Sequence, residues 1–176
     1  MAGSLIKIAE TTITSSTASV TLTGIDSTYN VYKLVINNLK PSADDAPLMR
    51  VTKSGTAQSD ANYDDAKKYL KADDSFATIA GTNRTGVDIM ATCDSASFAG
   101  SNGVYYLFNF ANSSEYSFIT IESSHFQATV HSIRGFMGGF VHTVASASDG
   151  VLIKFDNFAS GSTIETGTFT LYGLKK

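Results

Sequence analysis

The chain has 176 residues and a net charge of −3, so it can build a core of its own but lacks the clustered Lys and Arg needed to bind nucleic acid through its phosphates. Charged residues make up only 16%, against about 25% in an average soluble domain, and 22 serines and 20 threonines supply most of the polarity. With 43% hydrophobic residues, this composition indicates one all-β domain spanning residues 1–176, with neutral exposed faces.

Short runs of alternating apolar and polar residues begin at the N-terminus and predict strands separated by turns. The longest run, at residues 31–39, is apolar on both faces, so we expect a central strand there. Both prolines, Pro41 and Pro47, lie in the break that follows it. The strands predicted in this part of the chain are residues 5–10, 19–23, 31–39 and 48–53.

Residues 54–74 depart from this alternation. Ser59 could cap a helix in which Tyr63 and Leu70 share one face. A helix this short would depend on tertiary packing for its stability. We therefore expect this segment to be one short helix or an ordered loop.

The β pattern is strongest in the second half of the chain. The run VYYLFNF at residues 104–110 faces a partner at residues 116–123 across a turn, which predicts a hairpin. The run GTFTLYGL places Phe169 and Leu171 on one face and predicts a core strand for which the earlier strands leave a slot. Weaker strands are predicted at residues 76–79, 86–91, 129–133, 139–144 and 151–156. The glycines within residues 135–139 indicate a bulge or a close approach of neighbouring backbones.

About ten strands at this spacing, without helices between them, predict an antiparallel two-sheet β-sandwich of the jelly-roll type. The N-terminus lacks the basic and apolar regions of a signal peptide, and no apolar run approaches the roughly 20 residues of a membrane span. We expect a soluble protein made in a cytoplasm and not inserted in a membrane.

Residues capable of catalysis or metal binding are present but not patterned. His125, His131 and His142 have no carboxylate or cysteine at ligand spacing, and the acidic pairs lack the spacing of a calcium loop. No Gly-x-Ser-x-Gly elbow occurs, and Cys93 is typical of a small buried residue. We therefore expect no enzyme activity, no catalytic residues, no metal and no cofactor.

Asn62, Tyr63 and Tyr69 are the residues best suited to contact a ligand or a second subunit. Tyrosine rings stack on sugars, and amide groups bond their hydroxyls. The alternative is that both tyrosines anchor their segment to the sandwich. The aromatic side chains of residues 104–110 present the same choice between core, subunit contact and ligand platform.

Several stretches resemble small virion structural proteins of tailed bacteriophages. They are the closing GTFTLYGLKK, the preceding VLIKFDNFASGSTIE, the earlier VYKLVINNLKPSADDAPLMRVTKSGT and the segment SDANYDDA. The resemblance implies a jelly-roll-like sandwich on the virion, as a head decoration, knob, tail or fibre component made in the host cytoplasm. It implies no catalytic residues.

This resemblance predicts a non-enzymatic homo-oligomer that contacts phage capsid or tail proteins. Low charge density suits repeated packing of like subunits, and partner subunits would cover the sheet edges. The alternative is a carbohydrate-binding module that contacts a host-surface glycan through residues 54–74.

Overall fold

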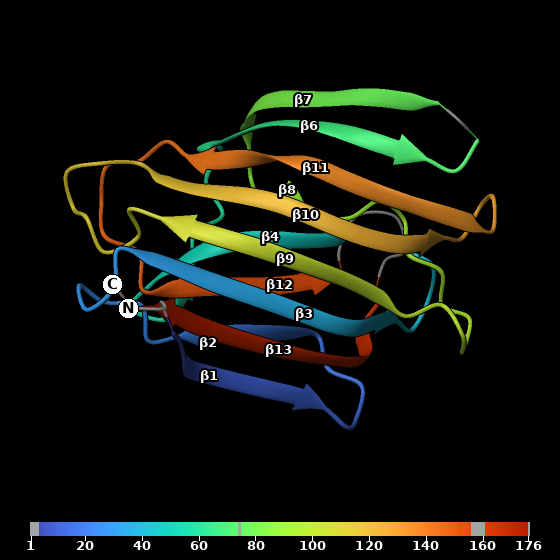
Figure 1. Cartoon of the computed structure of the whole chain (residues 1–176), viewed down its shortest axis with the longest axis horizontal. Coiled ribbons are helices and arrows are strands. Elements are labelled where there is room, and N and C mark those ends of the chain that lie inside the picture. Colours follow the sequence, from blue (N-terminus) through green and yellow to red (C-terminus); the bar gives the residue numbers. More distant parts are fainter. Residues whose placement is uncertain (1–3, 74, 156–160, 176) are drawn as a thin grey trace.

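The computed structural model describes residues 4–73, 75–155 and 161–175, and these form strands and loops without a helix. Figure 1 shows two antiparallel sheets packed face to face, with the larger sheet in front. The predicted all-β sandwich is therefore confirmed. In the part of the chain described, no helix is long and apolar enough to cross a membrane.

Among the described residues, eight strands form the large sheet and five belong to the small sheet. In spatial order, the large sheet consists of β1 (Leu5–Ile13), β13 (Ile164–Leu174), β3 (Val31–Pro41), β9 (Ser101–Phe108), β10 (Ser117–Gln127), β11 (Ser132–His142), β6 (Tyr63–Lys71) and β7 (Phe76–Arg84). The small sheet consists of β2 (Ser19–Thr23), β12 (Gly150–Phe155), β4 (Pro47–Lys53) and β5 (Thr56–Ala57), with β8 (Val87–Asp88) also paired to β4.

The strand order is that of a jelly roll with an addition. β1 pairs with β13 in the large sheet, and β2 pairs with β12 in the small sheet. The first two strands therefore run beside the last two strands from one sheet to the other, as in a jelly roll. β13 occupies the slot between β1 and β3, as its sequence predicts, and β3 is central. The strands β10, β11, β6 and β7 continue the large sheet beyond this roll, and we call these four strands the extension.

The helix or loop expected at residues 54–74 is wrong for most of that segment, which contains β5 and β6. Along β6, the side chains of Tyr63, Asp65 and Lys67 point inward and are buried, whereas Ala66 and Lys68 point outward. This is the period of two of a strand. This alternation cannot be recognised in the sequence, because two of the inward residues, Asp65 and Lys67, are charged.

Other boundaries also differ from the predictions. Residues 129–131 form a turn before β11, and the strand expected at residues 86–91 shrinks to β8. Of the two alternatives for residues 135–139, the bulge is absent, because β10 and β11 pair without interruption from Ser132 to His142. The close backbone approach is confirmed, because a Cβ on Gly138 or Gly139 would collide with the carbonyl oxygen of Ala66 or Ile119. Asp74 and Asp156, which end two of the predicted segments, lie outside the described residues.

The core lies between the sheets and continues under the extension. The segment after β8 packs against the inner face of the extension, where the Ser123 hydroxyl donates to the Ile89 carbonyl at 3.1 Å. Met90 and Cys93 of this segment are buried. The largest fully buried side chains are Tyr32, Tyr63, Tyr105, Phe110, Phe136, Phe169, Leu22, Leu34, Ile36, Leu39, Met49 and Ile89.

Candidate functional site

Tyr63 is an anchor inside the core. Its hydroxyl accepts a hydrogen bond from the Val51 N–H at 3.1 Å and donates one to the Gln58 carbonyl at 2.8 Å. Burial raises the pKa of Tyr63 to about 12, so the hydroxyl stays a donor. With no exposed surface, Tyr63 offers nothing to a ligand.

Tyr69 and Asn62 hold local structure as well. The Tyr69 ring stacks on His125 with 6.4 Å between ring centroids, and its hydroxyl donates to Gln127 Oε1 at 2.7 Å. The Asn62 carbonyl accepts hydrogen bonds from the Thr143 N–H and hydroxyl. Tyr63 and Tyr69 lie on the inner face of β6, so the three residues do not form a ligand platform on the surface.

The histidines do not converge on one point. His125 is buried on β10, His142 is buried against the Tyr63 ring, and His131 is exposed in a turn with Nδ1 3.0 Å from Asp94 Oδ2. Within the described ranges, no group of three His, Cys, Asp or Glu side chains could hold a metal ion. Burial raises the pKa of the Cys93 thiol to about 12, so this cysteine is not an activated nucleophile.

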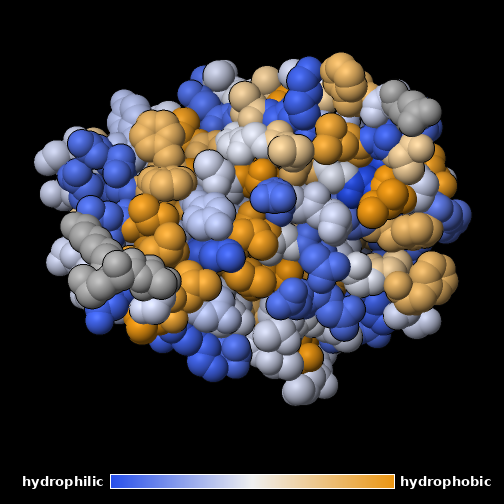
Figure 2. Space-filling view, in the orientation of Figure 1, coloured by the Kyte–Doolittle hydropathy of each residue, from blue (hydrophilic) through white to orange (hydrophobic). Residues whose placement is uncertain are grey.

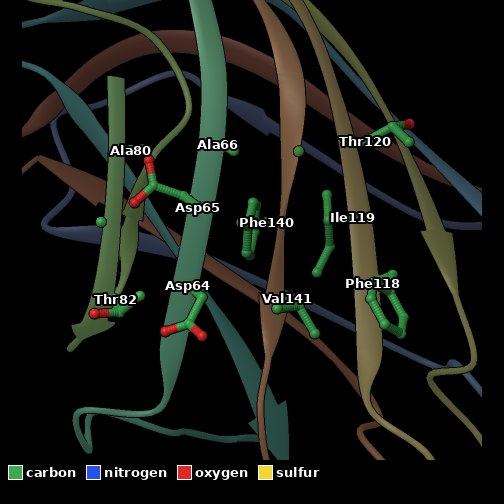
Figure 3. A pocket seen from close by; sticks show the side chains of 12 residues that line it. Asp64, Asp65, Ala66, Ala80, Thr82, Phe118, Ile119, Thr120, Phe140 and Val141 are labelled. Carbon is green, nitrogen blue, oxygen red and sulfur yellow. The ribbon is translucent and has the colours of Figure 1, made fainter. Parts of the chain in front are cut away.

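The feature that remains is a groove on the outer face of the extension. Strand register places side chains there in rows that cross the strands. In one row, Phe118 faces Val141 across β10 and β11, and Val141 faces Asp64 across β11 and β6. Figure 3 shows this row, with Thr82 of β7 at its end. These side chains form one wall of the groove.

The next row provides the floor. Register pairs Thr120 with Gly139, Gly139 with Ala66 and Ala66 with Ala80, so four strands contribute small side chains side by side (Figure 3). Larger side chains return in the following row, in which Glu122 faces Met137. The volume of the groove is about 700 Å³, and its lining is mostly apolar. Small residues between larger rows therefore hollow the sheet surface.

An apolar surface surrounds the groove. Phe118 is 46% exposed, Met137 53% and Phe76 64%, and Leu70 and Ile133 are also exposed on this face. Figure 2 shows orange and tan side chains over the extension, interspersed with polar ones. An apolar patch on a soluble protein commonly marks an interaction site. The polar groups at the groove are the Asp64 carboxylate and the hydroxyls of two threonines.

A buried ion pair stiffens the sheet behind this surface. Lys67 Nζ lies 3.0 Å from Asp65 Oδ2 and donates to the Asp88 carbonyl at 2.7 Å, and Asp65 also pairs with Arg84. Burial lowers the pKa of Lys67, whereas the Asp65 carboxylate opposes this shift. The pairing connects β6 to β7 and to β8. It therefore holds the strands that form the groove floor.

Comparison with known proteins does not identify a relative. No protein-family model matches the chain, and no curated protein matches it.

Proposed function

We propose that the protein is a non-enzymatic structural protein of a tailed-bacteriophage virion, which self-associates and decorates or extends the capsid or tail. The observation that carries this proposal is the exposed apolar face of the extension. Strands β10, β11, β6 and β7 lie outside the jelly roll, and their outer face presents large exposed apolar side chains among the polar ones typical of a solvated antiparallel sheet.

The sequence resemblance supports the same assignment. Its stretches form β3, β4, β12 and β13, which are neighbouring strands of the jelly roll, and reach the start of β6. The low charge of the chain keeps repulsion between packed copies small. A surface of this kind suits contact with a protein partner on the virion.

Binding to virion parts tests the proposal. We expect the purified chain to cosediment with capsid shells or tails of the phage that encodes it. Substituting Phe118→Asp or Met137→Asp should weaken this binding at least tenfold, or about 1.4 kcal/mol, because a charge would face the apolar contact.

The matched control is Leu5→Asp, which alters an exposed apolar side chain of β1 at the opposite edge of the large sheet and should leave binding unchanged. Absence of binding to both shells and tails would contradict the proposal. Equal weakening by all three substitutions would show that the extension is not the contact surface.

A specific observation favours carbohydrate binding as the second candidate. The Phe118 ring shares the groove with the Asp64 carboxylate and with the hydroxyls of Thr82 and Thr120, a combination that can stack on a sugar and bond its hydroxyls (Figure 3). Asp64 belongs to the segment that the sequence indicated for glycan contact.

Retention of the chain on host-cell surface polysaccharide in affinity electrophoresis tests this candidate. If the groove binds sugar, Phe118→Ala should abolish retention, and the Phe98→Ala control should not. A chain that ignores shells and tails but is retained on polysaccharide would replace the first proposal by the second. Absence of retention would remove the carbohydrate candidate.

A further inference from the structure

Among the residues that the structure describes, no strand pairs with the outer edge of β7, and this free edge exposes backbone hydrogen-bonding groups. The Lys71 N–H donates to the Ser75 carbonyl at 3.1 Å, so these two residues form a hydrogen-bonded pair at the start of the β6–β7 hairpin. Such pairs alternate along antiparallel strands. The register therefore turns the N–H and C=O groups of Phe76, Thr78 and Ala80 away from β6, toward the free edge.

Much of this edge lacks the features that usually protect edge strands. Residues 76–80 contain no charged residue and no proline, and the register shift against β6 and the charged Arg84 both follow them, at the end of β7. At the opposite edge of the same sheet, β1 carries Lys7 and Glu10, and its register shifts between Lys7 and Ala9. Charged side chains and bulges discourage pairing with another strand. The β1 edge is therefore protected, whereas the β7 edge is open over residues 76–80.

We infer that β7 pairs antiparallel with β7 of a second copy across a two-fold axis at Thr78, joining the two large sheets into one. This inference rests on the self-association in the proposed function and names the surface that performs it. Thr78 would face Thr78 of the second copy, and Phe76 would face Ala80. Because the contact is isologous, each copy contributes the same edge. No β7 edge remains free after two copies have paired, so the assembly stops at a dimer.

Side chains on the outer face fit this pairing. Ala80 ends the floor of the groove at β7, so the exposed ring of Phe76 from the second copy would lie beside it and cover that end. Lys68 Nζ lies 4.5 Å from the centroid of the Phe76 ring and donates to the Thr78 hydroxyl at 2.9 Å, which holds the ring near the edge. Each copy would therefore place an aromatic ring in the hollow of the other.

Charge does not oppose the contact. The two Lys68 residues would lie three strand spacings apart, or about 14 Å, which exceeds the Debye length of about 8 Å at physiological salt. Arg84 Nη2 already donates to the Ala80 carbonyl at 3.2 Å, which agrees with an outward carbonyl there. A carbonyl oxygen accepts two hydrogen bonds, so a strand of the second copy can still bond it.

A proline substitution tests the backbone contact. We expect light scattering over a concentration series to give twice the 18.7 kDa mass of the chain for the wild type. Thr78→Pro removes an outward N–H and should raise the dissociation constant of the dimer at least tenfold, whereas it leaves the hydrogen bonds to β6 intact. Thr78→Val is the control, because it also loses the hydroxyl bond to Lys68 but keeps the N–H.

Crosslinking gives an independent readout that needs no proline in a strand. Opposed residues of a hydrogen-bonded pair lie about 5.5 Å apart at Cα, within disulfide range, so Thr78→Cys should form a covalent dimer with oxidised glutathione. Two copies of Thr82 would lie about 26 Å apart, so the Thr82→Cys control should not crosslink. Cys93 is buried and does not compete.

Two results would overturn the inference: a wild-type chain that stays monomeric at every concentration, or a dimer that Thr78→Pro leaves intact and Thr78→Cys fails to crosslink. Its failure is distinct from that of the proposed function. A monomer that still binds shells or tails removes the β7 dimer alone. A β7 dimer that binds neither removes the virion assignment alone.

Discussion

The substitution Asp65→Asn is expected to lower the free energy of unfolding by about 3–5 kcal/mol, because it leaves a buried ammonium group without its counter-charge. The side chains of Asp65 and Lys67 are 0% and 2% exposed, and they lie 3.0 Å apart. The Asp88 carbonyl that also accepts from Lys67 carries no full charge, and the Asp88 carboxylate attracts the ammonium less than Asp65 does, so neither replaces the lost carboxylate. Arg84 would lose its partner in the same step.

Urea unfolding monitored by circular dichroism measures this loss. The matched control is Asp64→Asn, at the neighbouring carboxylate on the outer face, which accepts one hydrogen bond from the Asn83 N–H and should cost about 1 kcal/mol or less. The double variant Asp65→Leu with Lys67→Met should recover most of the lost stability, because it removes both charges. Equal losses at Asp64 and Asp65 would contradict the prediction.

The same ion pair explains why β6 could not be predicted. A buried strand face is expected to read as apolar at every second residue, but this face contains Asp65 and Lys67. The spacing of Asp64 and Lys68 suits a helical pair as well, so the local signal favoured the wrong element. Only the distant partners, Arg84 and the backbone of β8, make the charges tolerable inside.

Where apolar residues alternate without buried charge, the sequence does predict the fold. Alternation locates the runs that form β2, β10 and β13, and a run that is apolar on both faces locates β3. The predicted two-sheet sandwich of the jelly-roll type follows from the number and spacing of such runs, which depend on local properties of the chain. Their ends were less accurate, since β13 begins at Ile164 and β10 extends to Gln127.

The groove was not predicted because it depends on register between strands distant in sequence. Ala66, Gly139 and Thr120 are unremarkable where they stand in the chain, and they become a floor only when β6 and β10 flank β11 in the observed register. A shift of one residue would turn these side chains to the other face. The sequence places Phe118 in the second strand of a predicted hairpin, but it does not indicate which face of the sheet the side chain occupies.

Mild acid is expected to destabilise the extension through His125. This ring is 3% exposed, lies between Tyr69 and Phe136, and has Arg134 as its nearby charge. Burial, with a smaller contribution from Arg134, lowers the pKa of His125 from 6.5 to about 4. Within that interval the unfolded chain binds a proton that the folded chain does not, so stability falls as the pH falls.

The loss begins as the pH drops below about 6.5 and is complete below about 4, where it amounts to about 3 kcal/mol from this residue. We expect His125→Phe, which keeps an aromatic ring between Tyr69 and Phe136, to reduce the stability difference between neutral pH and pH 4 by that amount in urea unfolding. Burial also lowers the pKa of His142, but this contribution is common to both proteins and cancels in the comparison. An equal acid loss in wild type and variant would show that His125 is not the sensitive group. A reduced loss would identify His125, on the inner face of the extension, as a group through which acid weakens the sheet, because protonation places a charge beside Arg134 at a buried position.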